Sequence, residues 1–161
     1  MAERLQLKES PEVSIFRGVA KVIREDPTLK RIGLNVNAWE DSPDDLKEIT
    51  ADLCPHVEIS PSAGETRWSE ANQHSSNFNI DFLLTVNGTN ADDVLNLWHA
   101  IREALLPTTD ATLRAKVQAY LGPKADNFKY SKQPYQIVPR PGSVRMLQGE
   151  GAISIILNVN T

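Results

Sequence analysis

FNIDFLLTVNGTNADDVLNLWHAIREAL, residues 78–105, is the stretch of sequence that decides the fold. Over its first nine residues, large apolar side chains at every second position alternate with Asn79, Asp81, Leu83 and Thr85, which is typical of a strand with one buried face. The predicted buried face consists of Phe78, Ile80, Phe82, Leu84 and Val86. Asn87-Gly88 then predicts a turn, because glycine adopts backbone conformations that other residues avoid.

The second half of this stretch predicts an amphipathic helix. Asn90 is a favourable N-cap, and Asp92 and Asp93 fall in the first turn, where the helix dipole favours negative charge. Apolar residues then recur at intervals of three and four, which places them on one helix face. That face consists of Val94, Leu97, Trp98, Ile101, Ala104 and Leu105. Pro107 predicts the end of the helix.

The chain before this unit supplies further elements. Ser10-Pro11 predicts the start of a helix that Asp26-Pro27 ends, with a buried stripe at Val13, Phe16, Val19, Ala20 and Ile23. Alternation over residues 32–38 predicts a strand, and a short helix follows at residues 43–53. Val57 and Ile59 predict another strand, which Pro61 closes.

The chain after this unit reads as a helix followed by strands. Residues 112–121 predict a helix that Gly122-Pro123 ends, and residues 124–134 predict an irregular basic connection. Short strands are expected at residues 135–139 and 144–148, with a turn at residues 149–151. Alternation over residues 153–159, with Ser154, Ile156 and Asn158 opposite the buried set, predicts a final strand.

These elements predict a single α+β domain over residues 1–161, with helices packed on one face of a mainly antiparallel mixed β-sheet. Residues 60–77 are polar and predict an extended arm, either a long loop or a hairpin. Residues 122–148 form a basic extension.

Composition excludes several classes of protein. One cysteine, Cys54, rules out a disulfide framework and a cysteine-rich zinc site. No apolar run reaches the roughly 20 residues that a membrane helix needs, so we expect no membrane partner and synthesis in the cytoplasm. The net charge of −4 argues against a general nucleic-acid binder.

The residues that usually carry catalysis form no recognisable site. His56, His74 and His99 lack the spacing of a helical metal pair, and no glycine-rich phosphate loop is present, so we expect no metal and no cofactor. Cys54-Pro55-His56 brings a thiol and an imidazole close in sequence, which leaves a small hydrolase as one alternative. We interpret Cys54 as a structural thiol and predict that the protein is not an enzyme.

Charge is distributed unevenly along the chain. Residues 39–70 hold nine acidic and two basic residues, whereas residues 111–145 hold seven basic residues and one acidic residue. Such patches can meet head to tail between identical copies, or they can pair within one subunit or remain solvated. The candidate subunit or partner interface residues are Arg67, Trp68, Glu70, Lys129, Lys132, Arg140 and Arg145.

The polar faces of the strands are the last sequence feature with a possible function. Asparagine is disfavoured in strands, yet it recurs on these faces. Its presence predicts either an ordinary hydrated sheet face or a surface for a partner or a channel wall. The residues concerned are Asn35, Asn37, Asn79, Asp81, Thr85, Asn158 and Asn160.

The order and size of these elements resemble the tail-terminator and tail-completion (neck) proteins of tailed phages. The resemblance rests on the early helix at residues 11–25, the proline-bounded strand around Val57 and Ile59, the polar arm and the strand at residues 78–86. It continues in the helix DVLNLWHAIREAL, residues 93–105, and in GAISIILNV, residues 151–159.

This resemblance implies a structural virion protein that forms a ring, commonly sixfold. The ring would join the tail tube to the head-side connector at the phage neck, and DNA would pass through its lumen without specific binding. The family offers no catalytic residues. The alternative is a cytosolic oligomeric binding or assembly-chaperone domain.

Overall fold

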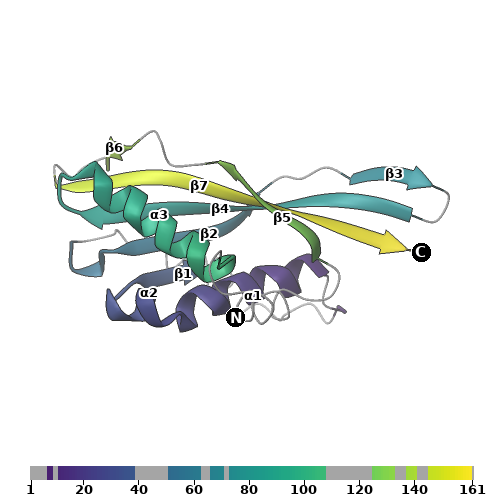
Figure 1. The fold of residues 1–161 in the computed structure, drawn as a ribbon, viewed down its shortest axis with the longest axis horizontal. Coiled ribbons are helices and arrows are strands. Elements are labelled where there is room, and N and C mark those ends of the chain that lie inside the picture. Colours follow the sequence, from purple (N-terminus) through teal and green to yellow (C-terminus); the bar gives the residue numbers. More distant parts are fainter. Residues whose placement is uncertain are drawn as a thin grey trace.

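The computed structural model places one β-sheet behind a layer of helices (Figure 1). It describes residues 7–8, 11–38, 51–62, 66–70, 73–107, 125–132, 137–140 and 145–160. The helices of these ranges are α1 (Pro11–Glu25), α2 (Pro27–Arg31), the short 3-10 helix η3 (Ala51–Leu53) and α3 (Ala91–Leu105). The strands are β1 (Asn35–Ala38), β2 (His56–Ser62), β3 (Thr66–Glu70), β4 (Gln73–Asn87), β5 (Ala125–Lys132), β6 (Val138–Pro139) and β7 (Met146–Asn160).

The sheet is mixed and mainly antiparallel, as the sequence predicts. Its strand order is β1-β2-β4-β7-β5, with β3 beside β4 and β6 beside β7. Only β1 and β2 run parallel among the described pairs. The α+β fold class is therefore confirmed, with helices α1 and α3 against one face of the sheet (Figure 1).

The core lies between α3 and the middle of the sheet. All six residues predicted for the buried face of α3 are buried, and so are Ile80, Phe82, Leu84 and Val86 of β4. The rings of Phe82 and Trp98 meet edge to face, with their centroids 5.5 Å apart. The side chain of Asn90 accepts a hydrogen bond from the backbone N–H of Asp92 at 3.0 Å, which confirms the predicted cap.

The predicted turn at residues 149–151 is wrong, because β7 is one continuous strand that pairs with β4 along its whole length. Gly151 has a different purpose. A β-carbon built there would lie 2.6 Å from atoms of the Trp98 ring. Glycine is therefore present to let the indole approach the sheet closely, not to reverse the chain.

The predicted end of α1 at Asp26-Pro27 is confirmed, since α1 ends at Glu25, but a second helix that the sequence did not predict begins there. Asp26 caps α2, and its Oδ2 atom accepts a hydrogen bond from the Leu29 N–H at 3.0 Å. Proline at the next position suits the first turn of a helix as well as it ends one. The strand predicted from residue 32 starts only at Asn35, and Ile32 is exposed. Val13, predicted to be buried, is exposed as well.

The polar arm is a hairpin, one of the two predicted possibilities. β3 pairs with residues 73–76 at the start of β4, so β4 begins well before Phe78. The basic connection predicted to be irregular contains β5, which pairs with β7. β6 confirms the short edge strand near Pro139. The helices predicted at residues 43–50 and 112–121, and the cap at Ser10, lie outside the described residues.

Candidate functional site

The predicted interface residues fall in three separate places. Residues 67, 68 and 70 lie on β3, at the end of the sheet where residues 73–76 of β4 pair with residues 157–160 of β7. Trp68 is opposite His74, and a register shift follows between Trp68 and Glu70. Among the described strands β3 pairs with β4 alone, so its other backbone edge is a candidate for pairing at that end of the sheet.

The basic residues lie elsewhere along β7. Lys129 and Lys132 are on β5, in register with Ser154 and Ala152 in the middle of β7. Arg140 donates its backbone N–H to the Met146 carbonyl oxygen at 2.7 Å. The Gly88 N–H donates to the Arg145 carbonyl oxygen at 2.6 Å. Arg140 and Arg145 therefore flank the start of β7, at the opposite end of the sheet from β3, and the seven residues do not form one patch.

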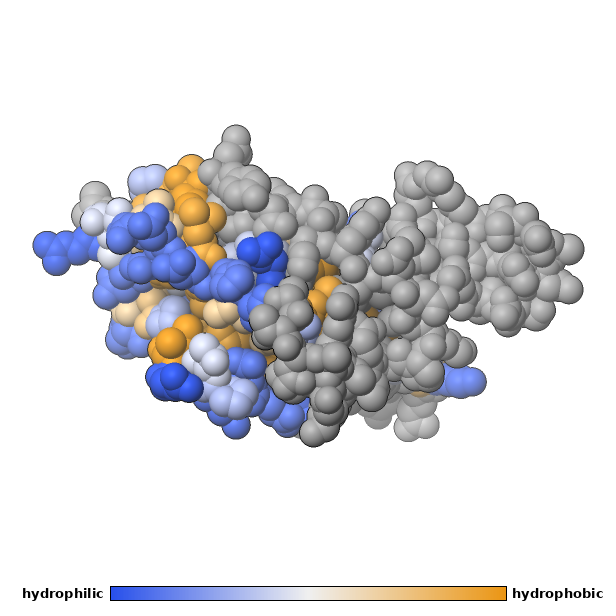
Figure 2. Space-filling view, viewed as in Figure 1, coloured by the Kyte–Doolittle hydropathy of each residue, from blue (hydrophilic) through white to orange (hydrophobic). Residues whose placement is uncertain are grey.

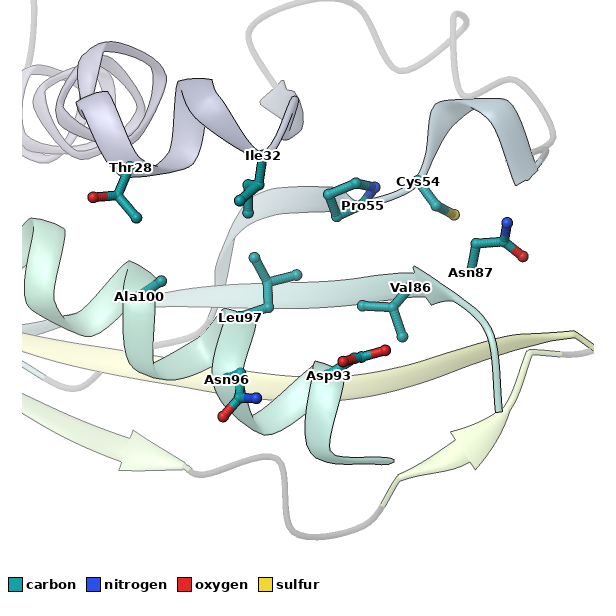
Figure 3. Close-up of a pocket in the computed structure, with 10 residues that line it drawn as sticks. All are labelled: Thr28, Ile32, Cys54, Pro55, Val86, Asn87, Asp93, Asn96, Leu97 and Ala100. Atoms are coloured by element: carbon teal, nitrogen blue, oxygen red, sulfur yellow. The ribbon is translucent and has the colours of Figure 1, made fainter. Parts of the chain in front are cut away.

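A groove that the sequence did not predict opens between α2 and α3. Its volume is about 420 Å³. Ile32 and Leu97 point toward each other from its two walls, with Cys54 and Pro55 beside Ile32 (Figure 3). The remaining lining residues are Thr28, Val86, Asn87, Asp93, Asn96 and Ala100. Figure 2 shows apolar surface between hydrophilic side chains over α2 and α3. The groove is thus apolar inside, with amide and carboxylate groups along the α3 wall.

Cys54 lies at one end of this groove, where two sulfur atoms meet. Its thiol contacts the Met146 sulfur at 3.8 Å. Burial raises the pKa of the thiol; the neighbouring Arg140 charge opposes this shift, and Asp52 adds to it. A thiol whose pKa lies above its ordinary value stays protonated at neutral pH, so Cys54 is poorly suited to act as a nucleophile.

His56 and Thr85 form a buried polar pair on the face of the sheet turned away from α3. They are opposite each other in β2 and β4, and their exposed fractions are 7% and 0%. Within the part of the chain that the structure describes, neither His56 Nδ1 nor Thr85 Oγ1 has a hydrogen-bond partner. Burial lowers the pKa of His56, and the Arg140 charge lowers it further. The expected hydrated face is therefore wrong at Thr85.

Farther along the same face lies a smaller polar hollow of about 240 Å³. Glu58, Asp81 and Glu150 line it together with Ser60. Asp81 is exposed and Asn79 is partly exposed, so this part of the face is hydrated as expected. No group of three or more histidine, cysteine or carboxylate side chains among the described residues is arranged to hold a metal ion. His99, on the other side of the sheet, is exposed on α3, and its Nδ1 lies 3.4 Å from Arg102 Nη2.

No family model matches the chain, and no curated protein sequence matches it. In the described ranges, no helix is both long enough and apolar enough to cross a membrane.

The groove has only a weak signal in the sequence. Its walls come from four separate segments, at residues 28–32, 54–55, 86–87 and 93–100. The one usable sign is Ile32. Once Asp26-Pro27 is recognised as the start of α2, Ile32 is a large apolar residue at the end of that helix and not the first residue of a strand. Periodicity assigned Ile32 to a strand, which hid its position at the rim.

Proposed function

We propose that this chain is a structural subunit that assembles with copies of itself into a ring, as a tail-terminator or tail-completion protein does at the neck of a tailed phage. The observation that carries the proposal is the ribbon formed by β3, the first part of β4 and the last part of β7. It continues past α1 and α3 (Figure 1). The order of elements along the chain supports the phage assignment.

The length of this ribbon is unusual for a chain of this size. β4 and β7 each have 15 residues, whereas strands in globular proteins usually have 3–10. At about 3.3 Å per residue, such a strand spans about 50 Å. Among the side chains that the structure describes, the core residues of these two strands are Ile80, Phe82, Leu84, Val86 and Ile153. A strand pair that continues beyond its helices has its use outside the subunit, where backbone edges and side chains can meet a neighbour.

Arg67 and Trp68 are the anchors that we assign to this contact. Arginine and tryptophan are enriched among the residues that dominate interface energies. Both lie on β3, the outer strand at this end of the ribbon. In the assembled neck, the ring would join the tail tube to the head-side connector, and DNA would pass through the lumen. The protein would act in the virion, after synthesis in the host cytoplasm, without catalysis.

The test compares ring assembly of the unmodified chain with that of a variant substituted at Arg67 on β3. Mass photometry and negative-stain electron microscopy over a range of concentrations should give closed rings of one stoichiometry. Arg67→Glu should leave the folded subunit and reduce ring formation about tenfold or more, the effect of losing one interface anchor. Arg31→Glu, at an exposed position of α2, makes the same charge change and should assemble normally.

Three results would count against the proposal. A chain that stays monomeric at every concentration, alone and with isolated tail tubes, contradicts self-assembly. A stable dimer without rings favours the binding or chaperone alternative. Normal rings from Arg67→Glu would remove β3 from the contact.

A further inference from the structure

The groove between α2 and α3 has no part in the ribbon contact, and it remains open to solvent. Ile32 stands at its rim with 45% of its surface exposed, although it is a large apolar residue. Exposed apolar surface inside a concave site marks a place where another apolar group binds. We propose that this groove receives Leu7 and Lys8 from the N-terminal arm of a second copy, an inference that rests on the proposed self-assembly.

Leu7 supplies the apolar part of this match. Its exposed fraction is 78%, the highest among the large apolar residues that the structure describes. Leu7 and Lys8 belong to no helix or strand, so the segment can enter a groove in an extended form. The facing side chains of Ile32 and Leu97 form an apolar slot that suits one leucine side chain (Figure 3). Docking would remove the exposed side chains of Leu7 and Ile32 from water at the same time.

The polar groups along the α3 wall match the rest of the segment. The Asp93 carboxylate lines the groove, and Asp92 is next to it on the exposed first turn of α3. Lys8 is exposed and carries the opposite charge. The side-chain amides of Asn87 and Asn96 can donate to and accept from the backbone of an extended segment.

Geometry assigns the segment to another copy, because the chain cannot carry it back to its own groove. Leu7 precedes the start of α1, whereas Thr28 and Ile32 follow its end. A helix of 15 residues is about 22 Å long. The four steps from Pro11 back to Leu7 span at most about 14 Å. In Figure 1, α2 lies at the end of α1 that is opposite to its first residue, Pro11.

Cys54 offers a direct probe, since it is the only cysteine and it lines the groove. The reaction of the full-length protein with N-ethylmaleimide at pH 8 can be followed by mass spectrometry in the monomeric and assembled fractions. Assembly should slow the modification of Cys54 about tenfold or more, because a docked side chain excludes the reagent. Leu7→Asp should restore the monomer rate and weaken assembly by a similar factor.

A charge exchange and a matched substitution make the test specific. Lys8→Asp and Asp93→Lys should each weaken assembly, and the double variant should recover most of the loss, since it restores an opposite pair. Leu95→Asp is the control. Leu95 lies on α3 with 36% of its surface exposed but does not line the groove, so this variant should assemble like the unmodified chain.

Each remaining outcome overturns a defined statement. If rings form while Cys54 reacts at the monomer rate, or if Leu7→Asp assembles normally, the groove inference is wrong and the ring proposal stands. If Cys54 is protected in the monomer and Leu7→Asp exposes it, Leu7 and Lys8 fill the groove of their own chain, and the assignment to a second copy is wrong. If the unmodified chain never assembles, both proposals fail.

Discussion

The same two strands, β4 and β7, pass through two different environments. Over residues 80–86, β4 pairs with β7 beneath α3, and Ile80, Phe82 and Leu84 are fully buried. Over residues 73–76, β4 still pairs with β7, and its neighbour on the other side is β3 instead of β2. Backbone pairing between β4 and β7 is thus present in both regions, whereas only the region at residues 80–86, here called the covered region, packs against α3. The described contacts with α3 lie in the covered region, and the ribbon is the part to which we assign the proposed assembly contact.

Removing Trp98 should give the largest effect, because this side chain joins α3 to both long strands. It meets Phe82 of β4 edge to face and covers Gly151 of β7. Trp98→Ala should lower the free energy of unfolding by about 3–5 kcal/mol, the usual cost of truncating a buried aromatic residue. Urea unfolding followed by circular dichroism measures this loss. A loss below about 1 kcal/mol would mean that the covered region does not carry the stability.

A smaller effect should follow when a methyl group is added on the strand side of the same contact. Gly151→Ala places a β-carbon 2.6 Å from the indole in the present geometry, so strand and helix must separate. Overpacking of this kind costs about 1–3 kcal/mol. In the Trp98→Leu background the same substitution should cost less, because the ring is gone. Equal costs in both backgrounds would show that Gly151 matters for the backbone and not for the indole.

Gly151 also shows where sequence reasoning stops. Local pattern correctly predicted the strand, the cap at Asn90 and the buried face of α3, since all three depend on neighbouring residues. Glycine reads locally as a turn, and only the position of Trp98, far away in sequence, gives it another meaning. β5 was missed for a similar reason: its polar composition conceals a strand that exists because β7 pairs with it.

The candidate site was harder to predict than the fold. The interface residues chosen for charge and aromatic character lie on three parts of the sheet, because sequence charge does not report spatial neighbours. The contact of Cys54 with Met146 joins residues 92 positions apart, so no local pattern predicts the burial that raises the pKa of its thiol. Likewise, no local pattern predicts that α2 and α3 leave a groove.

The covered region should also respond to acid through His56. Because burial lowers the pKa of His56 in the folded state, the unfolded chain binds a proton more readily than the folded chain does. Stability should therefore be constant above the ordinary pKa of 6.5 and should fall as the pH drops below it, until the folded histidine titrates. His56→Phe should reduce this acid-dependent loss in urea unfolding measured from pH 8 to pH 5. His99→Phe, at an exposed position, is the control that should retain it.

The smallest effect on stability is expected in the ribbon, where the comparison is sharpest. Arg67 lies on β3, outside the region that α3 covers. Arg67→Glu should therefore change the free energy of unfolding of the monomer by less than about 0.5 kcal/mol, as most surface substitutions do. The same variant should reduce ring formation, because we propose that the ribbon contacts a neighbouring subunit. Urea unfolding and mass photometry on one preparation separate the two quantities. If Arg67→Glu unfolded the subunit as readily as Gly151→Ala, the ribbon would belong to the folding unit, and the division between the two regions would be wrong.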